Sequence, residues 1–365
     1  MIPGWKIKRE LLRIAQQMRG VPERIIDPLR MRLLNSRVNA GLPRFEGEQS
    51  IRDKVAVVLV YQPDGLPGSL VHLCEWLVSK GYAPLIVSNT PLSDSDRKRI
   101  SPVIWRCILR PNFGYDFGGY RDALTTLRLW SVEPQHLLIV NDSVWLPMLP
   151  DTDLIERGEA QPADIVGSVM RRRQEEVFLE SYYFQLKGHV LRAPAFLRFW
   201  SELRLTSNKY YVIRRGERGF TRAMLKSGFT VAPLFGPEQL SELLAGRDVG
   251  FLEKTLEYSA IVEPEFLEAR TDLLEAPARD EAWRQDAMDF IVRSLDKLQG
   301  YSSFPYAAVT LLGYPFLKKS TDPTAVAWRG AFVRAVEAGD IPSPPSSILA
   351  ELKESVARSE PIRDR

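Results

Sequence analysis

Continuous apolar runs of strand length recur along the middle of the chain, separated by segments in which apolar residues return every three or four positions. The apolar runs lie at residues 55–61, 83–88, 103–109 and 137–140. Runs this uniformly apolar are typical of strands buried on both faces of a sheet. The intervening segments have the spacing of amphipathic helices. Strands that alternate with helices over short loops predict an α/β fold with a mostly parallel sheet flanked by helices.

In the second half of the chain, the regular alternation of strands and helices first gives way to a less regular mixture and then to mostly helical spacing. Further strands are expected at residues 163–169, 181–186 and 229–232, the middle one antiparallel, with helices at residues 196–205 and 219–226. After residue 236 the spacing is mostly helical. These changes divide the chain into a basic amphipathic arm and linker (1–50), a catalytic domain (51–236) and a mostly helical C-terminal region (237–365).

Composition places the chain among soluble globular proteins. Of its 365 residues, 45% are hydrophobic and 26% charged, which is enough apolar material for a sizeable core. The two cysteines sit inside apolar patterns and form no disulfide framework, as expected in a reducing compartment. No apolar run approaches the roughly 18 residues of a membrane span, and the first thirty residues lack a secretory signal. We therefore expect a cytoplasmic protein.

Basic charge is concentrated at the N-terminus. Residues 1–50 contain ten Lys and Arg against five Asp and Glu, although the net charge of the whole chain is only +3. Ile7, Leu11 and Ile14 follow helical spacing, with basic residues on the opposite side. This pattern is typical of a helix that lies on an anionic membrane surface, so residues 1–38 are expected to contact the inner face of the cytoplasmic membrane. The alternative is an amphipathic helix docked on its own domain. The rest of the chain offers no broad basic face, which argues against nucleic acid as a partner.

A glycine-rich loop follows the third strand. Gly114 and Gly118 stand where the backbone can approach a phosphate, and Arg110 adds a cation. Asn112 and Asp116 provide acceptors for sugar hydroxyls or for ribose. The same residue types would also serve a tight strand-to-helix connection in which Asp116 caps the helix.

Asn141, Asp142 and Ser143 end the fourth strand and hold at least one carboxylate at the carboxyl edge of the sheet. Oxygen ligands at this place suit Mg²⁺ or Mn²⁺, with Asp142 as the ligand, and the metal would neutralise a departing diphosphate. The alternative is that these residues only terminate the strand through side-chain turn bonds.

Glu217 precedes the helix expected at residues 219–226 and would face the same edge, where a carboxylate can act as general base for an alcohol. The alternative is a first-turn glutamate favoured by the helix dipole. The three histidines never fall at metal-ligand spacing. Lys318 and Lys319 suggest a contact with a phosphate or a lipid headgroup.

Together these segments resemble the rhamnan synthesis F family of bacterial polysaccharide and O-antigen assembly. The residues that carry the resemblance are Arg110, Asn112, Gly114, Asp116 and Gly118; Val140–Ser143; Glu180–Tyr183 with Phe199 and Trp200; Glu217 with Gly228 and Phe229; and Gly313–Lys318. The layout is also similar to the GT-A fold of family 2 glycosyltransferases, with Asn141-Asp142-Ser143 in place of Asp-x-Asp. The first aspartate of that motif is absent here, which weakens the expected metal site.

The resemblance implies a glycosyltransferase that moves a deoxyhexose, rhamnose from dTDP-rhamnose, to a lipid-linked glycan with inversion. Glu217 would deprotonate the acceptor, Asp142 and the metal with Arg110 would hold the diphosphate, and the ends of the first two strands would face the nucleoside through Tyr61, Asp64 and Asn89. Two other hypotheses remain open. One is a non-catalytic glycan-binding or assembly protein on a degenerate scaffold. The other is a methyltransferase, although such enzymes place their cofactor loop after the first strand.

Overall fold

The computed structural model describes residues 26–173, 176–297 and 303–359. Their central feature is a nine-stranded, mostly parallel sheet with helices packed on both faces. The predicted α/β class, a mostly parallel sheet flanked by helices with a helical C-terminal region, is confirmed. Most of the predicted amphipathic arm lies outside the described residues. No helix in the described ranges is long and apolar enough to cross a membrane.

The first half of the sheet follows the predicted alternation of strand and helix. Its elements are β2 (Lys54–Val60), α2 (Gly68–Ser79), β3 (Tyr82–Ser88), α3 (Asp94–Ile100), β4 (Arg106–Leu109), α4 (Tyr115–Leu129) and β5 (His136–Asn141). All four strands run parallel to their neighbours in this group. Gly81 ends the α2 connection with a positive φ of 84°, a conformation in which a β-carbon would be strained.

The second half adds strands of both directions. Its elements are β6 (Val144–Trp145), α5 (Leu154–Ala160), β7 (Ile165–Arg173), β8 (Glu176–Leu179), β9 (Tyr183–Lys187), α6 (Gly188–Arg192), α7 (Pro194–Glu202), α8 (Lys209–Val212), a π-helical turn (Ile213–Glu217), α9 (Arg218–Lys226) and β10 (Val231–Phe235). β9 is antiparallel to both β5 and β7, as the sequence predicted, whereas β10 returns parallel to β7.

The strand order places a crossover next to the middle of the sheet. The order is β1-β4-β3-β2-β5-β9-β7-β10, with β8 paired to β7. The chain therefore moves outward from β2 to β4 and then crosses back to β5 on the other side of β2. In open α/β sheets, ligands bind beyond the carboxyl ends of the strands at such a switch point. The ends of β2 and β5 are the place to look for a site.

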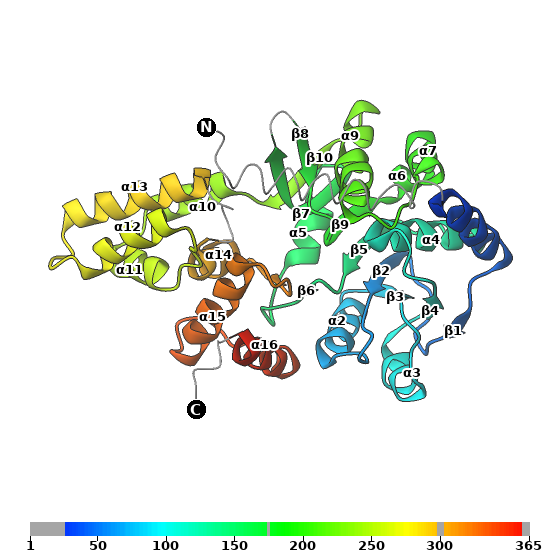
Figure 1. The fold of residues 1–365 in the computed structure, drawn as a ribbon, viewed down its shortest axis with the longest axis horizontal. Helices are drawn as coiled ribbons and strands as arrows, with labels where there is room; N and C mark the ends of the chain where they lie inside the picture. The colour runs from blue at the N-terminus through cyan, green and yellow to red at the C-terminus, as the bar shows by residue number, and fades with distance from the viewer. Residues whose placement is uncertain (1–25, 174–175, 298–302, 360–365) are drawn as a thin grey trace.

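Two hydrophobic cores cover the two faces of the sheet, and β2 supplies both because successive side chains point to opposite faces. Ala56, Val58 and Val60 belong to the core shared with α2 and the C-terminal helices. Val57 and Leu59 belong to the core shared with α4, α7 and α9. Figure 1 shows α4 and α7 on one side of the strands and α2 and α3 on the other.

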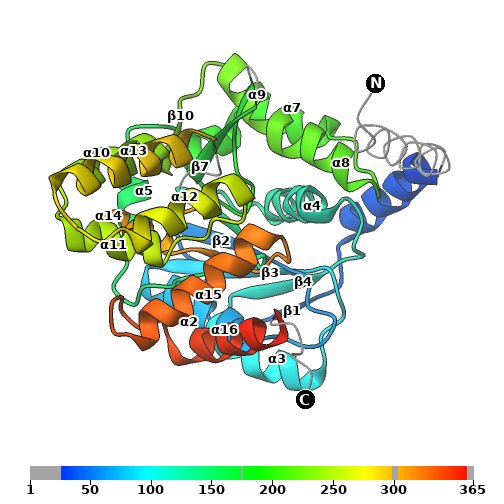
Figure 2. The ribbon, with the colours of Figure 1, turned by 60° about the vertical axis from the view of Figure 1, so that its left-hand side comes forward.

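The C-terminal region is helical, as predicted. It contains α10 (Pro237–Ala245), α11 (Val249–Glu257), α12 (Pro264–Glu275), α13 (Glu281–Lys297), α14 (Pro305–Leu312), β11 (Leu317–Lys318), α15 (Pro323–Glu337) and α16 (Ser346–Ser359). α10 to α13 form a lobe that projects from the sheet, whereas α15 packs on α16, which contacts α2 (Figure 2). β11 pairs with β6, directly after β5, so this region reaches the switch point.

One segment differs from its prediction. Residues 41–47, expected to be a linker, contain β1 (Arg44–Glu46), which pairs antiparallel with the edge strand β4. Its three residues are too few for a recognisable period of two, so only the unpaired edge of β4 reveals their partner. The helix at residues 26–40 packs Leu34 and Val38 into the core beside α4, so this part of the arm docks on its own domain.

Candidate active site at the carboxyl ends of the central strands

The carboxyl ends of β2 and β5 meet the start of α4, and polar side chains gather there. Asn141 is the last residue of β5, and Asp116 lies in the first turn of α4. The amide Nδ2 of Asn141 donates to the Asp116 carboxylate over 3.0 Å. Asp116 does not cap its helix, contrary to the alternative considered above, because Gly114 occupies the N-cap position and no side chain caps it. Its carboxylate instead belongs to the cluster at the sheet edge.

The carbonyl oxygen of the Asn141 side chain forms a side-chain turn with Ser143, as expected if these residues terminate the strand. This Oδ1 atom accepts the backbone N–H of Ser143 over 3.1 Å and the Ser143 hydroxyl as well. Such side-chain turns are a usual way to end a strand. Because both ends of the Asn141 amide are engaged, this residue orients Asp116 and the loop after β5 rather than offering a free oxygen.

Asp142 is held by the neighbouring strand. Its Oδ2 accepts the backbone N–H of Tyr61 and the Nε2 of Gln62, both over 2.8 Å. Its own N–H donates to the carbonyl of Leu59 over 3.0 Å. Burial raises the pKa of the Asp142 carboxyl, and the two donated hydrogen bonds oppose that shift. The carboxylate is therefore fixed at the point where β2 and β5 end side by side.

Glu217 reaches the same edge from a different direction. It ends the π-helical turn Ile213–Glu217, which runs on into α9, so it is not the free first-turn glutamate of the alternative. Such π turns are frequent at functional sites because they turn a side chain out of the regular helical row. Glu217 Oε2 accepts the backbone N–H of Ser181 over 3.1 Å, and the Ser181 carbonyl accepts the hydroxyl of Tyr120 over 2.8 Å.

Electrostatic coupling shows that the three acids converge. Burial, together with the negative charges of Asp142 and Glu217, raises the pKa of Asp116 to about 6. The pKa of Glu217 is also raised, chiefly by burial, with Ser181 opposing and Glu180 adding to the shift. Like charges that share a desolvated site disfavour one another's ionised forms. The three carboxyl groups thus form an electronegative cluster that a cation would stabilise.

Two cations border the cluster, and both come from the C-terminal region. Lys318 Nζ pairs with Glu180 at 3.0 Å, and Arg171 binds the same carboxylate. Burial alone would raise the pKa of Glu180, but these two cations outweigh it and the pKa is lowered. Lys319 Nζ lies over the Trp145 ring at 5.2 Å and 3.4 Å from the Ser69 hydroxyl.

Lys319 is the cation that faces Asp142. Burial lowers the pKa of its ammonium group, while the charges of Glu351 and Asp142 oppose that shift. A lysine in such a place is a compact positive charge with donors to spare, the kind of group that binds a phosphate oxygen. The predicted phosphate role of the Lys318-Lys319 pair therefore fits Lys319 in particular.

Arg110 requires a correction. Its side chain is 0% exposed. Its three guanidinium nitrogens donate to Asp122 at 2.7 Å, to the Asn89 amide oxygen at 2.5 Å and to the Phe113 carbonyl at 2.6 Å. A guanidinium that is fully buried and engaged at all three nitrogens has no N–H exposed to a diphosphate, so the structure does not support the predicted phosphate contact of Arg110. The arginine instead shapes the loop between β4 and α4.

The other predicted residues divide into exposed and enclosed ones. Tyr61 is 50% exposed, and Asp64, Asn112 and Ser143 are also exposed near the strand ends. Asn89 is buried, and its Nδ2 donates to Asn112 over 3.3 Å, so its contact with a nucleoside would pass through Asn112.

The two motif glycines serve the connection between β4 and α4. Gly114 has a φ of 83°, in the left-handed region that favours glycine. A β-carbon at Gly118 would lie 2.1 Å from the Phe113 carbonyl oxygen. The tight connection considered above is therefore present. The predicted contact of these two glycines with a phosphate stays a prediction.

The residues present fit a metal only with help from a substrate. In the described part of the chain no three His, Cys, Asp or Glu side chains stand close enough to hold an ion. Mg²⁺ is commonly bound through one or two carboxylates together with substrate phosphates. Asp142 matches that mode, with Asp116 as the nearby second carboxyl.

Three further residues matter for the geometry but escaped the sequence argument. Gln62 fixes Asp142, Ser181 fixes Glu217, and Tyr120 joins α4 to Ser181. Tyr120 is a fully buried aromatic residue of α4, a position at which the sequence indicates core packing and no functional role. Gln62 and Ser181 are polar residues next to strand ends, which is the one signal that could have marked them.

Comparison with known proteins agrees with the motifs. Residues 85–256 match the family described as rhamnan synthesis protein F. The chain is also 36% identical to the uncharacterized protein y4gN of Sinorhizobium fredii over 262 residues, which cover 71% of this chain and 68% of that protein. The chain belongs to the rhamnan synthesis protein F family. The matched segment contains the loop of Arg110, the Asn141 to Ser143 motif and Glu217.

Among solved structures, two similar ones are a mannosyltransferase, PcManGT of Pyrobaculum calidifontis, in complex with GDP-Man and Mn²⁺, and residues 1–349 of S. aureus TarS in complex with UDP-GlcNAc. The first is 10% identical and covers 95% of this chain and 97% of its own, with a TM-score of 0.32. The second is 13% identical and covers 84% and 88%, with a TM-score of 0.27. These scores are too low to support an argument about this chain.

Proposed function

We propose that this member of the family is a glycosyltransferase that transfers a deoxyhexose, rhamnose from dTDP-rhamnose, to a lipid-linked glycan of a bacterial surface polysaccharide. The observation that carries the proposal is the convergence of Asp116, Asp142 and Glu217 at the switch point of the sheet. Family membership supports the polysaccharide context and the choice of rhamnose. The site supports the chemistry, since it offers a half-buried base beside groups suited to a charged leaving group.

The reaction would be a single displacement. Glu217 takes the proton of the acceptor hydroxyl, the acceptor oxygen bonds to the anomeric carbon, and the bond from that carbon to the diphosphate oxygen breaks with its electron pair. Attack from the side opposite the leaving group inverts the anomeric centre. Burial raises the pKa of Glu217, which makes its carboxylate a better proton acceptor than an exposed glutamate.

The departing diphosphate needs positive charge, and two sources stand at the end of β5. Lys319 faces Asp142 and replaces Arg110 as the proposed protein cation. Asp142 would hold Mg²⁺ or Mn²⁺, which when bound neutralises the diphosphate charge. The exposed residues Tyr61, Asp64 and Asn112 would contact the nucleotide, and Asp116 and Ser143 the sugar. Asn141 would position Asp116 through its amide.

The test is release of dTDP from dTDP-rhamnose in the presence of an octyl-linked, rhamnose-terminated acceptor and Mn²⁺. Glu217→Gln should lower kcat by about 10²–10⁴-fold, because the proton acceptor is lost while the shape is kept. In the wild-type enzyme, log kcat should rise with pH through an apparent pKa above the usual 4.5 of a glutamate and then level off. That acid limb should vanish in Glu217→Gln.

The matched control is Glu176→Gln, because Glu176 is an exposed glutamate that pairs with Arg218 and Arg222 of α9 and with none of the proposed catalytic or binding residues. Its activity should remain within about twofold of wild type, as for most surface changes. Asp142→Ala should remove activity that added Mn²⁺ does not restore. Full activity in both Glu217→Gln and Asp142→Ala would contradict the assignment.

A second candidate function follows from the same residues. The amide at position 141 removes one acid from the expected motif, and both ends of that amide are engaged. A non-catalytic glycan-binding protein would accept this loss. Binding of dTDP-rhamnose or of the glycan, without turnover with any donor and acceptor pair, would favour that role.

A further inference from the structure

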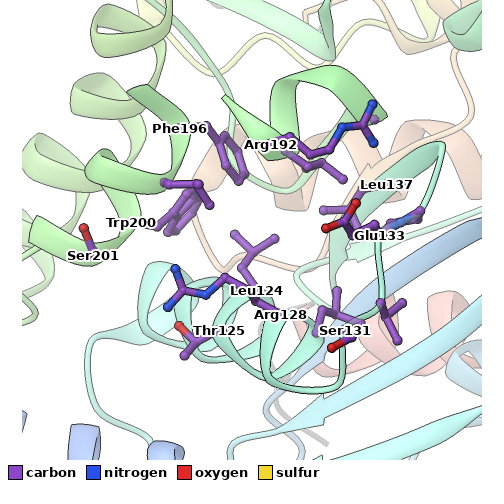
Figure 3. Close-up of a pocket in the computed structure, with 16 residues that line it drawn as sticks. Leu124, Thr125, Arg128, Ser131, Glu133, Leu137, Arg192, Phe196, Trp200 and Ser201 are labelled. Atoms are coloured by element: carbon purple, nitrogen blue, oxygen red, sulfur yellow. The ribbon is translucent and has the colours of Figure 1, made fainter. Parts of the chain in front are cut away.

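A cavity of about 390 Å³ lies on the α4 face of the sheet, apart from the acids described above. It is open to solvent on one side and is lined by the C-terminal half of α4, the loop before β5, α6 and α7. Figure 3 shows Phe196 and Trp200 of α7 on one side of the cavity, with Leu124 of α4 and Leu137 of β5 opposite. Its volume falls in the range of small-molecule sites in proteins, roughly 300–1,000 Å³.

The walls are apolar, but they contain a hydrogen-bond donor without a partner. Trp200 is only 4% exposed, and its indole Nε1 has no acceptor among the described residues. A buried indole N–H normally finds one, because leaving it unpaired costs roughly 1–3 kcal/mol. The Nε1 atom is itself buried, so Trp200 presents its apolar ring, and not its N–H, to the cavity.

The rim carries positive charge. Arg128 and Arg192 both line the cavity and are exposed, and neither forms an ion pair within the residues the structure describes. One carboxylate, that of Glu133, stands at the same rim. Two free guanidinium groups at the mouth of an apolar cavity suit a ligand whose acidic head remains at the surface while its hydrocarbon body is buried.

The cavity is separate from the candidate active site. Leu137 lies near the start of β5 and Asp142 directly follows its last residue, five positions later, which corresponds to about 16 Å along a strand. Asp116 and Arg128 lie twelve residues apart on α4, or about 18 Å along the helix axis. A ligand in the cavity would therefore sit near the amino end of β5, and the acids near its carboxyl end. A sugar diphosphate held at Asp142 does not fill this space.

We propose that this cavity binds an amphipathic anion, a hydrocarbon chain with a phosphate head, through Arg128 and Arg192 at the rim. The N-terminal residues 1–25 are a less suitable occupant, because their excess of Lys and Arg would meet two further arginines. A phosphate head could belong to a free amphiphile or to a lipid in a bilayer. The chemistry of recognition is the same in both cases, and the experiment separates them.

The probe is dodecyl phosphate below its critical micelle concentration, titrated into the full chain and followed by calorimetry. One molecule should bind per chain. The double variant Arg128→Glu with Arg192→Glu should weaken binding at least tenfold, because attraction for the head becomes repulsion. Dodecanol and inorganic phosphate, which each lack one half of the ligand, should bind at least tenfold more weakly than dodecyl phosphate.

The matched control is Arg198→Glu with Arg204→Glu, two exposed arginines in and just after α7 that do not line the cavity. It should bind dodecyl phosphate like the wild type, and circular dichroism should show both double variants folded. The source of the phosphate head is tested by co-sedimentation with phosphatidylcholine vesicles that contain phosphatidic acid. If the Arg128 and Arg192 variant alone loses co-sedimentation, the head belongs to a bilayer lipid. If the chain binds monomeric dodecyl phosphate but not the vesicles, the head belongs to a free amphiphile. Equal affinity in both double variants, or binding seen only after deletion of residues 1–25, overturns the proposal.

Discussion

At the scale of single residues, the charge of the site depends on the hydrogen-bond and ion-pair partners of each carboxyl group. Asp142 and Glu217 each accept hydrogen bonds from a neighbouring segment, whereas Glu180 is neutralised by Lys318 and Arg171. Asp116 has one amide donor and two negative neighbours. Ionisation of Asp116 should therefore lower the free energy of unfolding, and this effect can be measured.

The first residue-scale prediction is that Asp116→Asn stabilises the protein at neutral pH. The folded-state pKa of Asp116 is raised to about 6 from the usual 3.8 of an aspartate. Between these values the folded state binds more protons than the unfolded state, so stability falls as pH rises towards 6 and then stays level. At pH 7.5 the variant should melt roughly 2–5 °C higher than wild type. The gain should shrink steadily as the pH is lowered from 6 to 4.

The control for this change is Asp64→Asn, because Asp64 is exposed at the end of β2 and makes no described ion pair. Its melting temperature should stay within about 1 °C of wild type at every pH. A gain in Asp116→Asn that is the same at pH 4.5 and pH 7.5 would mean that the carboxyl group is not strained by its neighbours. Stabilisation with loss of turnover is the usual sign that charge repulsion serves function.

At the scale of elements, short irregular pieces aim the functional groups. The π turn before α9 brings Glu217 to Ser181, and the loop around buried Arg110 brings α4 to the sheet edge. The loop is close-packed because the helix begins directly over it. That packing is the physical reason for glycine at position 118.

The element-scale prediction concerns Gly118→Ala. The new β-carbon would lie 2.1 Å from the Phe113 carbonyl oxygen and 2.9 Å from Arg110 Nη2, so the loop must move. Overpacking of this kind costs about 1–3 kcal/mol, which urea denaturation should detect. Turnover should fall as well, because the loop displaces Asp116. Gly246→Ala, at a glycine with open space around it, should leave both quantities near wild type.

At the scale of the whole molecule, the C-terminal region completes the site. Glu351 of α16 accepts the Ser69 backbone N–H over 2.8 Å, the Ser69 hydroxyl over 2.6 Å and the Trp145 indole N–H over 2.8 Å. Lys319 lies over the same Trp145 ring. One carboxylate thus ties the last helix to α2, to β6 and to the lysine that faces Asp142.

The prediction at this scale is that Glu351→Ala weakens both the fold and the reaction. Loss of the acceptor leaves three buried donors unpaired, which should lower the free energy of unfolding by about 1–3 kcal/mol. Turnover should also fall, because Lys319 loses a neighbouring charge and the support of Trp145. Glu354→Ala, on the same helix but paired only with Arg358 at the surface, is the matched control. Equal effects of the two substitutions would remove the link between α16 and the site.

Much of this protein could be predicted from its sequence by itself. Apolar runs and helical spacing record which side of each element is buried, so the strands of the sheet, the antiparallel β9 and the helical C-terminal region followed from them. Parallel strands share one carboxyl edge, which is why Asp142 and Asp116 could be placed there in advance. The short strand β1 escaped because three residues carry no period.

The tertiary structure decided which of those side chains can bind a ligand and which are engaged in hydrogen bonds and ion pairs with neighbouring residues. Arg110 was predicted as a free cation, but Asn89 and Asp122 enclose it. Lys319 faces Asp142 only because β11 returns to pair with β6 after some 170 further residues. Periodicity reports burial within one element and says nothing of contacts between distant ones. The pairing of charges in a buried site depends on those contacts, so it became visible only when the chain was folded.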